Sequence, residues 1–218
     1  MSHELRNPLN AIIGFSEMIK NETFGAIANP KYEEYIGDIH FSARHLLDII
    51  NDVLDMSKIE AGKVNLLETE VAVDDVMRSV GRIMQPRAQA AQVNLHTDIP
   101  EGLPAMKADQ RLLRQILINL VSNAVKFSPP GTDVQVSARI SNDNSLVIEI
   151  ADQGAGIPED KLRYVMEPFG QVNDPRSYKG QGTGLGLPLA KAMGELHDGY
   201  ISLQSREGAG TTVTMSFP

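Results

Sequence analysis

The glycine run at residues 180–186 is the first feature of this 218-residue sequence that could do chemistry, because glycine occupies every second position. Glycines let backbone N–H groups approach phosphates closely, and a helix that opens beside them presents the positive end of its dipole to an anion. The run is not a Rossmann fingerprint, since Leu185, Leu187 and Leu189 stand where that pattern needs its last glycine. A P-loop pattern is absent. Alone, the run fits either a phosphate-binding loop of another kind or a hinge without a ligand.

A second candidate is the carboxylate of Asp152, which follows an apolar stretch and precedes Gly154, Gly156 and Ile157. A carboxylate at the end of a buried strand can accept a hydrogen bond from a ligand amine in a cleft. An aspartate shortly before glycine is also common in turns that bind nothing. The segment by itself leaves both interpretations open.

Asn119 and Asn123 form a third candidate, because a spacing of four places them on one face of the helix expected over 109–127. An amide oxygen suits Mg²⁺, which usually takes few protein ligands and completes its shell with substrate phosphates. Lys126 could neutralise a phosphate, and Phe127 could pack on a base. Two solvated asparagines would explain the pair alone, but three such sites in one region favour a nucleotide pocket.

At the other end of the chain, His3 could act as a nucleophile, because a neutral imidazole is well populated near pH 7. Glu4 could accept the other ring N–H, fix the tautomer and raise the nucleophilicity. Asn7, four residues on, shares a flank of the helix with His3. A surface histidine is usually only solvated, so these residues alone do not establish catalysis.

These N-terminal residues begin a predicted helical hairpin, with one helix from residue 5 and a second over 32–56, ending at 61–63. Residues 21–30 carry Asn, Gly and Pro and are expected to connect the helices. The predicted packing seams are Leu5, Leu9, Ile12, Ser16 and Ile19 in the first helix, and Tyr32, Tyr35, Ile39, Ser42, Leu46, Ile49, Val53 and Met56 in the second, where Leu47, Ile50 and Leu54 widen the apolar stripe. One hairpin cannot bury so wide an apolar stripe, so we expect a homodimer with a four-helix bundle. Packing on the chain's own C-terminal domain is the alternative.

Beyond residue 62 the pattern changes to strands mixed with helices. The predicted strands are 64–71, 93–99, 134–140, 146–151, 200–205 and 211–217, and the predicted helices are 74–90, 109–127, 159–164 and 184–197. We therefore expect an α-helical hairpin over 1–62, followed by an α+β two-layer sandwich over 63–218 with one sheet and helices on one face.

Composition excludes several function classes. Without cysteine there is no disulfide scaffold, zinc knuckle or thiol nucleophile, which fits a cytoplasmic location. No stretch approaches the ~18 consecutive apolar residues of a membrane span, so we expect no membrane contact from this fragment. A net charge of −8 argues against a nucleic-acid partner.

Taken in order, these blocks resemble the signature boxes of bacterial two-component sensor histidine kinases. The block at 3–8 resembles the H box, 119–127 the N box, 152–156 the G1 box, 167–169 the F box and 182–187 the G2 box. Each block is weak alone, whereas all of them in this order are specific. The phrases around the connection and the last helix are similar to the alphaproteobacterial cell-cycle kinases of the PleC, DivJ and PdhS group.

The resemblance implies a dimerisation and histidine-phosphotransfer hairpin followed by an ATP-binding domain of the Bergerat, or GHKL, type. It implies that His3 is the phosphoacceptor and Glu4 its base or orienting partner. Asn123 would hold Mg²⁺ with support from Asn119, and Asp152 would bind the adenine amine. The other implied ATP-binding residues are Lys126, Phe127, Gly154, Gly156, Ile157, Lys179, Gly182, Thr183, Gly184, Leu185 and Gly186. Residues 170–182 would form a mobile lid.

The implied activity is ATP-dependent autophosphorylation of a histidine, followed by phosphotransfer to an aspartate of a response-regulator receiver domain. Asn7 stands where the family more often has Thr; either residue can position a water, which is compatible with phosphatase activity toward that aspartate. The alternatives are a nucleotide-binding pseudokinase and another Bergerat ATPase, although the latter lacks a histidine-bearing hairpin. Because the family's first helix begins well before the H box, we expect this sequence to lack that start and any sensor region.

Overall fold

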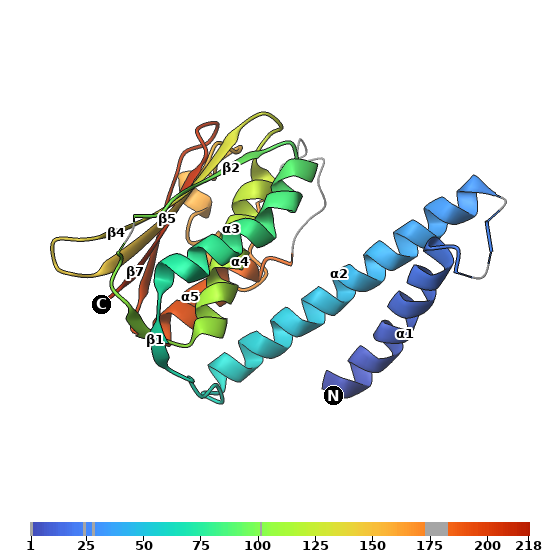
Figure 1. Ribbon diagram of the computed structural model, residues 1–218, viewed down its shortest axis with the longest axis horizontal. Coiled ribbons are helices and arrows are strands. Elements are labelled where there is room, and N and C mark those ends of the chain that lie inside the picture. The colour runs from blue at the N-terminus through green and yellow to red at the C-terminus, as the bar shows by residue number, and fades with distance from the viewer. Residues whose placement is uncertain (1, 24, 28, 101, 173–182) are drawn as a thin grey trace. The chain divides into compact units, whose positions relative to one another are not determined.

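The computed structural model describes every residue except 1, 24, 28, 101 and 173–182 (Figure 1). Within the first helix, the side chains of residues 2–6 and 8 also lie outside the description. The chain divides into two compact units, residues 1–61 and 62–218. Of the predicted site residues, Lys179 and Gly182 fall outside the described part, as do the side chains of His3 and Glu4.

The first unit is a hairpin of α1 (Ser2–Lys20) and α2 (Pro30–Glu60). Asn29 caps α2 by accepting a hydrogen bond from the Lys31 N–H at 3.0 Å, and Pro30 occupies the first turn, where its missing N–H costs little. The helical hairpin predicted from the apolar spacing is therefore confirmed.

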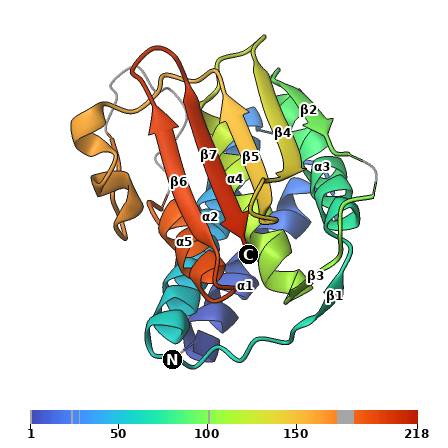
Figure 2. The same cartoon turned by 90° about the vertical axis from the view of Figure 1, so that its left-hand side faces the viewer.

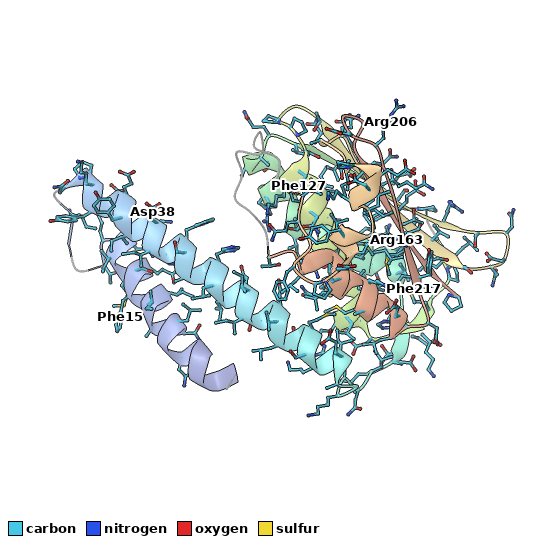
Figure 3. The ribbon with its side chains drawn as sticks, turned by 180° about the vertical axis from the view of Figure 1, so that it is seen from behind. Phe15, Asp38, Phe127, Arg163, Arg206 and Phe217 are labelled. Carbon is cyan, nitrogen blue, oxygen red and sulfur yellow. The ribbon has the colours of Figure 1, made fainter. Side chains whose placement is uncertain are left out.

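The seam inside the hairpin keeps the predicted residues Leu9 and Ser16 of α1, which are buried, but uses Ile13 in place of Ile12. In α2 it uses Ala43 together with Leu47 and Ile50, two residues expected to widen the predicted stripe. Its small core consists of Leu9, Ile13, Ala43, Leu47 and Ile50. In α1, Ile13 is 7% exposed, whereas the predicted seam residue Ile12 is 46% exposed. Each helix carries two adjacent apolar stripes, and the intramolecular contact uses only one. The second stripe stays on the surface, where Phe15 points away from α2 (Figure 3).

The second unit is a layer of helices against a five-stranded sheet, as predicted. The sheet order is β2-β4-β5-β7-β6, and only the β2–β4 pair is parallel. Its strands are β2 (Asn94–Asp98), β4 (Asp133–Ile140), β5 (Leu146–Asp152), β6 (Tyr200–Ser205) and β7 (Thr211–Phe217). Helices α3 (Val73–Ala90), α4 (Gln110–Phe127) and α5 (Gly186–Glu195) pack against one face of this sheet (Figure 2).

Some predictions for this unit were wrong. The expected single sheet is accompanied by a small second one. The strand predicted over 64–71 shrinks to β1 (Thr69–Val71), which pairs antiparallel with β3 (Met106–Ala108), a strand that the sequence pattern did not indicate. A strand of three residues is too short to show the alternation of apolar and polar residues by which strands are predicted. The helix expected over 159–164 is two 3₁₀ turns, η1 (Glu159–Lys161) and η2 (Tyr164–Met166).

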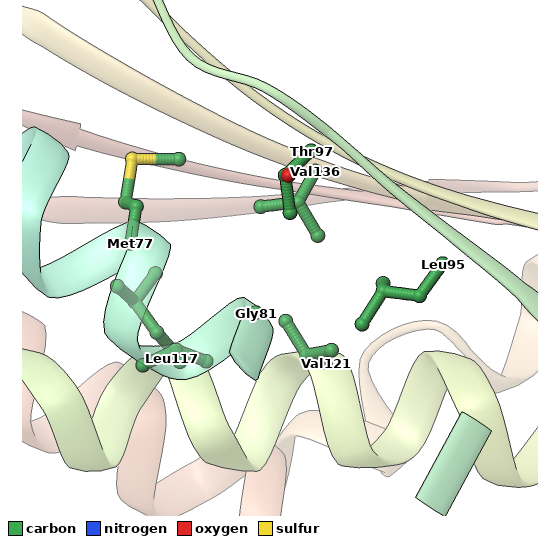
Figure 4. A pocket seen from close by; sticks show the side chains of 8 residues that line it. Met77, Gly81, Leu95, Thr97, Leu117, Val121 and Val136 are labelled. Atoms are coloured by element: carbon green, nitrogen blue, oxygen red, sulfur yellow. The ribbon is translucent and has the colours of Figure 1, made fainter. Parts of the chain in front are cut away.

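The core lies between the sheet and the helices. Strand β4 alternates exposed and buried residues, because one face meets the helices and the other meets water. An apolar cavity of about 10 Å³ remains between α3, α4 and the sheet, lined by Met77, Gly81, Leu117, Val121 and Val136 among others (Figure 4). Such a space holds one water at most, so it is a packing gap and not a ligand site. Among the described residues, no helix is both long and apolar enough to span a bilayer.

Candidate functional site

Helix α4 supplies four of the predicted site residues. Asp109 caps the helix by accepting hydrogen bonds from the backbone N–H groups of Arg111 and Leu112. The apolar side of α4 packs into the core, which leaves Asn119 and Asn123 half-buried at its margin. The helix therefore presents the two amides on one side, with the basic and aromatic residues at its C-terminal end.

The side-chain amide of Asn119 is only partly satisfied by hydrogen bonds. Its Oδ1 accepts a hydrogen bond from Gln115 Nε2 at 3.0 Å. Its Nδ2 is buried and has no hydrogen-bond partner among the described residues. A buried donor without a partner costs free energy, so this amide fits a polar group supplied by a ligand or by bound water.

Lys126 and Phe127 lie together at the end of α4. The Lys126 Nζ lies 5.1 Å from the centroid of the Phe127 ring, within cation–π distance. Burial and the nearby charge of Arg87 lower the pKa of Lys126. The Phe127 ring is 51% exposed, although large aromatic rings normally bury their faces. A cation and an exposed ring side by side suit a ligand that has both a phosphate and a base.

Asp152 ends strand β5 between β4 and β7. Its Oδ1 accepts hydrogen bonds from the N–H groups of Gly154 at 2.8 Å and Thr211 at 3.1 Å. Burial raises the pKa of this carboxyl, although both hydrogen bonds act to lower it. Within the described part of the chain, no hydrogen bond ends on Oδ2. The side chain can therefore accept one more donor, as the recognition of a ligand amine requires.

The glycines of the predicted boxes are the places where these segments meet. A Cβ at Gly186 would lie 3.2 Å from Asn123 Nδ2, and one at Gly154 would lie 2.6 Å from the Phe127 carbonyl oxygen. Gly156 has φ +70°, and a Cβ there would lie 2.1 Å from the Arg206 carbonyl oxygen. The structure thus brings the N box, the G1 box and the start of the last helix into one site.

A hydrogen bond between Gly184 and Phe169 connects the residues on either side of the segment predicted to be a lid. Gly184 has a φ of +70°, and its carbonyl oxygen accepts a hydrogen bond from the Phe169 N–H at 3.0 Å. Thr183 Oγ1 accepts from the Leu185 N–H at 3.1 Å. The Leu185 side chain is only 1% exposed, so it belongs to the core and only its backbone is suited to ligand contact. Ile157 is fixed by a hydrogen bond from its N–H to Ser205 Oγ at 2.8 Å.

The predicted phosphoacceptor His3 and the two residues expected to assist it lie in the first unit. Residues His3, Glu4 and Asn7 belong to the first turns of α1, and the Asn7 side chain is exposed to solvent. These three residues belong to the unit of residues 1–61, whereas the candidate ATP-binding residues belong to the unit of residues 62–218.

Sequence reasoning missed the residues that support Asp152 from β6 and β7. Thr211 pairs with Asp152 in the register of β5 and β7, and a Cβ at Gly210 would lie 2.0 Å from the Asp152 carbonyl oxygen. Ser205 Oγ is within hydrogen-bond distance of Thr211 Oγ1, at 2.8 Å. The Gly208-Ala-Gly210-Thr211 turn was visible in the sequence, but the pairing of β5 with β7 was not.

The residues present fit Mg²⁺ only if phosphate oxygens complete its shell. Among the residues that the structure describes, no three His, Cys, Asp or Glu side chains gather as a metal site. Asn123 offers one amide oxygen, and the glycine opposite it leaves room that a Cβ would fill. This sparse set suits a metal that arrives with a nucleotide.

Comparison with known families matches both units. Residues 108–218 match the family described as histidine kinase-, DNA gyrase B- and HSP90-like ATPase. Residues 1–62 match the His Kinase A (phospho-acceptor) domain.

Two curated relatives cover the whole chain. The non-motile and phage-resistance protein of Caulobacter vibrioides is 46% identical over 221 residues, and the chain covers 26% of its length. The cell-division control histidine kinase PdhS of Brucella anthropi is 39% identical over 226 residues, with 21% of its length covered. The chain thus spans about a quarter of the length of these relatives.

Solved structures have the same fold. Full-length ShkA, in a crystal structure with AMPPNP, is similar with a TM-score of 0.82 and 28% identity, covering 100% of this chain and 44% of that one. The Acinetobacter baumannii histidine kinase AdeS has a TM-score of 0.69 at 21% identity, covering 99% of this chain and 96% of that one, and supports the fold alone.

Proposed function

This chain belongs to the histidine kinases, and from that premise we propose that it transfers the γ-phosphoryl group of ATP to His3 and then to an aspartate of a receiver domain. The observation that carries the proposal is the single site formed by Asn123, Phe127 and Asp152 around closely packed glycines. An exposed ring, a carboxylate with one oxygen that accepts no hydrogen bond from the described residues, and a half-buried lysine match the base, the amine and the phosphates of ATP.

The proposed first step forms a bond between an imidazole nitrogen of His3 and the γ-phosphorus. The bond from that phosphorus to the bridging oxygen breaks, and ADP leaves with the electron pair. Glu4 accepts the proton from the other ring nitrogen and holds the tautomer that attacks. In the second step, a carboxylate oxygen of the receiver aspartate attacks the same phosphorus, the bond from phosphorus to the ring nitrogen breaks, and the imidazole leaves after its other ring nitrogen takes back the proton from Glu4.

Within the ATP site, we assign the base to Asp152 and Phe127, and the phosphates to Lys126 and the backbone N–H groups that begin α5. Asn123, supported by Asn119, would hold Mg²⁺. That ion would neutralise charge on the transferring phosphate, as is general in phosphoryl transfer. The undescribed residues Lys179 and Gly182 are further candidates for phosphate contact.

We propose that residues 1–62 are the phosphotransfer and dimerisation domain and 63–218 the ATP-binding domain. The exposed apolar stripe of the hairpin, which includes Phe15, Ile12 and Ile39, supports a second copy as partner. Sedimentation at micromolar concentration should give a dimer, and Ile39→Glu should shift it toward monomer. A monomeric wild-type chain would contradict this part of the proposal.

The receiver domain is expected to dock on the hairpin near His3. Asn7, exposed in the next turn of α1, is placed on the same helix and would orient the water that hydrolyses the aspartyl phosphate. ATP and receiver domains both belong to the cytoplasm, where we expect the reaction to occur.

Incubation with Mg²⁺ and γ-labelled ATP tests the proposal directly. The wild-type chain should incorporate label that is stable to alkali and lost in acid, and His3→Ala should incorporate none. His96→Ala is the matched control, because His96 is an exposed histidine of the ATP-binding unit and should leave labelling intact.

Two results would redirect the proposal. Equal labelling of wild type and His3→Ala would make another residue the phosphoacceptor. Nucleotide binding without any labelling would favour a pseudokinase.

A further inference from the structure

A buried histidine, His197, lies in the turn that follows α5 and is 7% exposed. Its Nε2 accepts a hydrogen bond from the Asp109 backbone N–H at 3.0 Å, and its Nδ1 lies 2.8 Å from the Met193 carbonyl oxygen. A backbone N–H can only donate and a carbonyl can only accept. The two contacts therefore assign a neutral imidazole with its proton on Nδ1.

The turn holds this ring rigidly. The N–H groups of His197 and Gly199 both donate to the Gly194 carbonyl oxygen at 2.9 Å. A Cβ at Gly199 would lie 2.8 Å from the Phe217 ring, which in turn meets the His197 ring edge-on at 6.3 Å. The imidazole is thus fixed by the backbone on one side and by β7 on the other.

The partner of His197 is the cap of the helix that carries the N box. Asp109 Oδ1 holds the first N–H groups of α4, and its Oδ2 accepts the Leu67 N–H at 3.2 Å. Burial acts to raise the pKa of Asp109, but hydrogen bonds from Leu67 and Leu112 and the charge of Arg111 outweigh it, so the pKa is lowered. The segment that follows α2, the start of α4 and the end of α5 therefore meet at one node, defined here as the buried residues His197 and Asp109 and the Leu67 N–H.

The same two helices meet again at the nucleotide site. Asn123 lies on α4 and Gly186 begins α5, and a Cβ on the glycine would touch the amide. Asp109 and Asn123 are 14 residues apart, which is about 21 Å of helix. Because a helix moves as a rigid rod over this length, a shift or rotation of its cap displaces Asn119 and Asn123 relative to α5.

We propose that His197 is a positioning residue for nucleotide binding. It acts through Asp109 and α4. We infer that the node couples the position of the segment after α2 to the position of the α4 amides in the ATP site. This inference rests on the proposed ATP-binding function. His197 does not touch the nucleotide; its neutral ring sets the position of the helix whose amides do.

Calorimetric titration of the full chain with AMPPNP and Mg²⁺, paired with thermal unfolding without nucleotide, tests the proposal. His197→Leu fills the space but leaves the Asp109 N–H unpaired, and we expect roughly tenfold weaker binding, in the usual range of coupling between sites. His197→Gln restores one acceptor and should recover most of that affinity. Phe217→Leu is the matched control, because it removes the aromatic neighbour of the ring and neither hydrogen bond.

The outcomes separate three cases. Wild-type affinity in folded His197→Leu, or an equal loss of affinity in Phe217→Leu, would reduce His197 to a packing residue and overturn the inference. Failure of the wild-type chain to bind AMPPNP would instead contradict the proposed function.

A measurement on the wild type covers the case in which His197→Leu does not fold. If the node and the nucleotide site are coupled, saturating AMPPNP must slow hydrogen exchange of the Asp109 amide, because coupling is reciprocal. An unchanged exchange rate at Asp109, with slowed exchange around Gly186, would overturn the proposal without any variant.

Discussion

Replacing Asp152 by Asn separates the contribution of this carboxyl to nucleotide binding from its effect on the stability of the protein. The asparagine Oδ1 can still accept the N–H groups of Gly154 and Thr211, so the local backbone should stay in place. What disappears is the buried negative charge, which burial disfavours enough to raise the pKa. We therefore expect Asp152→Asn to bind nucleotide worse and yet to unfold at a higher temperature at pH 7.

The size of the binding loss follows from the one contact that is removed. A hydrogen bond to a charged group contributes about 1.5–3 kcal/mol. Since about 1.4 kcal/mol corresponds to a factor of ten, affinity for AMPPNP should fall roughly 10- to 150-fold.

The stability difference should also depend on pH in a defined direction. With a raised pKa, folded Asp152 binds a proton more readily than the unfolded chain does, so wild type gains stability as the pH falls toward the ordinary value of 3.8 and loses that gain above the raised pKa. The asparagine of the variant cannot titrate. The advantage of Asp152→Asn should therefore be largest near pH 7 and shrink toward about pH 4.

Calorimetry with AMPPNP and thermal unfolding at several pH values measure both effects. Asp133→Asn is the control: Asp133 begins the neighbouring strand β4, and hydrogen bonds from Asn94 and His96 lower its pKa. This control should bind AMPPNP like wild type. Unchanged nucleotide affinity in Asp152→Asn would refute the assignment of Asp152 to the base, and a lower unfolding temperature at pH 7 would refute the argument about burial.

Three further substitutions test the packing around the site. Gly186→Ala places a Cβ against Asn123 in a helical turn, so Mg²⁺-dependent AMPPNP affinity should fall while unfolding in urea shifts by less than about 1 kcal/mol; unchanged affinity would contradict it. Gly156→Ala puts a side chain at φ +70° against the Arg206 carbonyl oxygen and should cost more than about 2 kcal/mol in urea unfolding, which a near-neutral result would exclude. Leu117→Ala enlarges the existing apolar cavity and should cost about 3–5 kcal/mol by the same assay, with AMPPNP affinity retained in the folded fraction.

Most of the secondary structure could be predicted from the sequence because it depends on local spacing. Helix α4 has Asp109 at its cap and a continuous apolar face, and the structure begins it at Gln110 and ends it at Phe127, as the pattern indicates. The boxes were equally visible, since each is a short run of chemically unusual residues. Strand β3 was missed because three residues carry no periodicity.

The hairpin seam shows where local pattern stops being sufficient. Ile12 and Ile13 are chemically identical neighbours, and only the crossing of α1 and α2 decides that Ile13 is buried. An apolar stripe wide enough for two helix contacts does not by itself determine which of its residues pack inside the hairpin.

The candidate nucleotide site likewise has features that the sequence predicts and features that depend on the tertiary structure. The sequence by itself determined which residues are candidates for the chemistry: the amides of α4, the carboxylate at the end of β5 and the glycines that flank them. Only the tertiary structure decided that Thr211 stands opposite Asp152, that Gly186 lies against Asn123, and that His197 is tied to the cap of α4. The physical reason is that residue types and short spacings are fixed along the chain, whereas strand order and helix contacts join residues tens of positions apart and depend on the packing of the whole core.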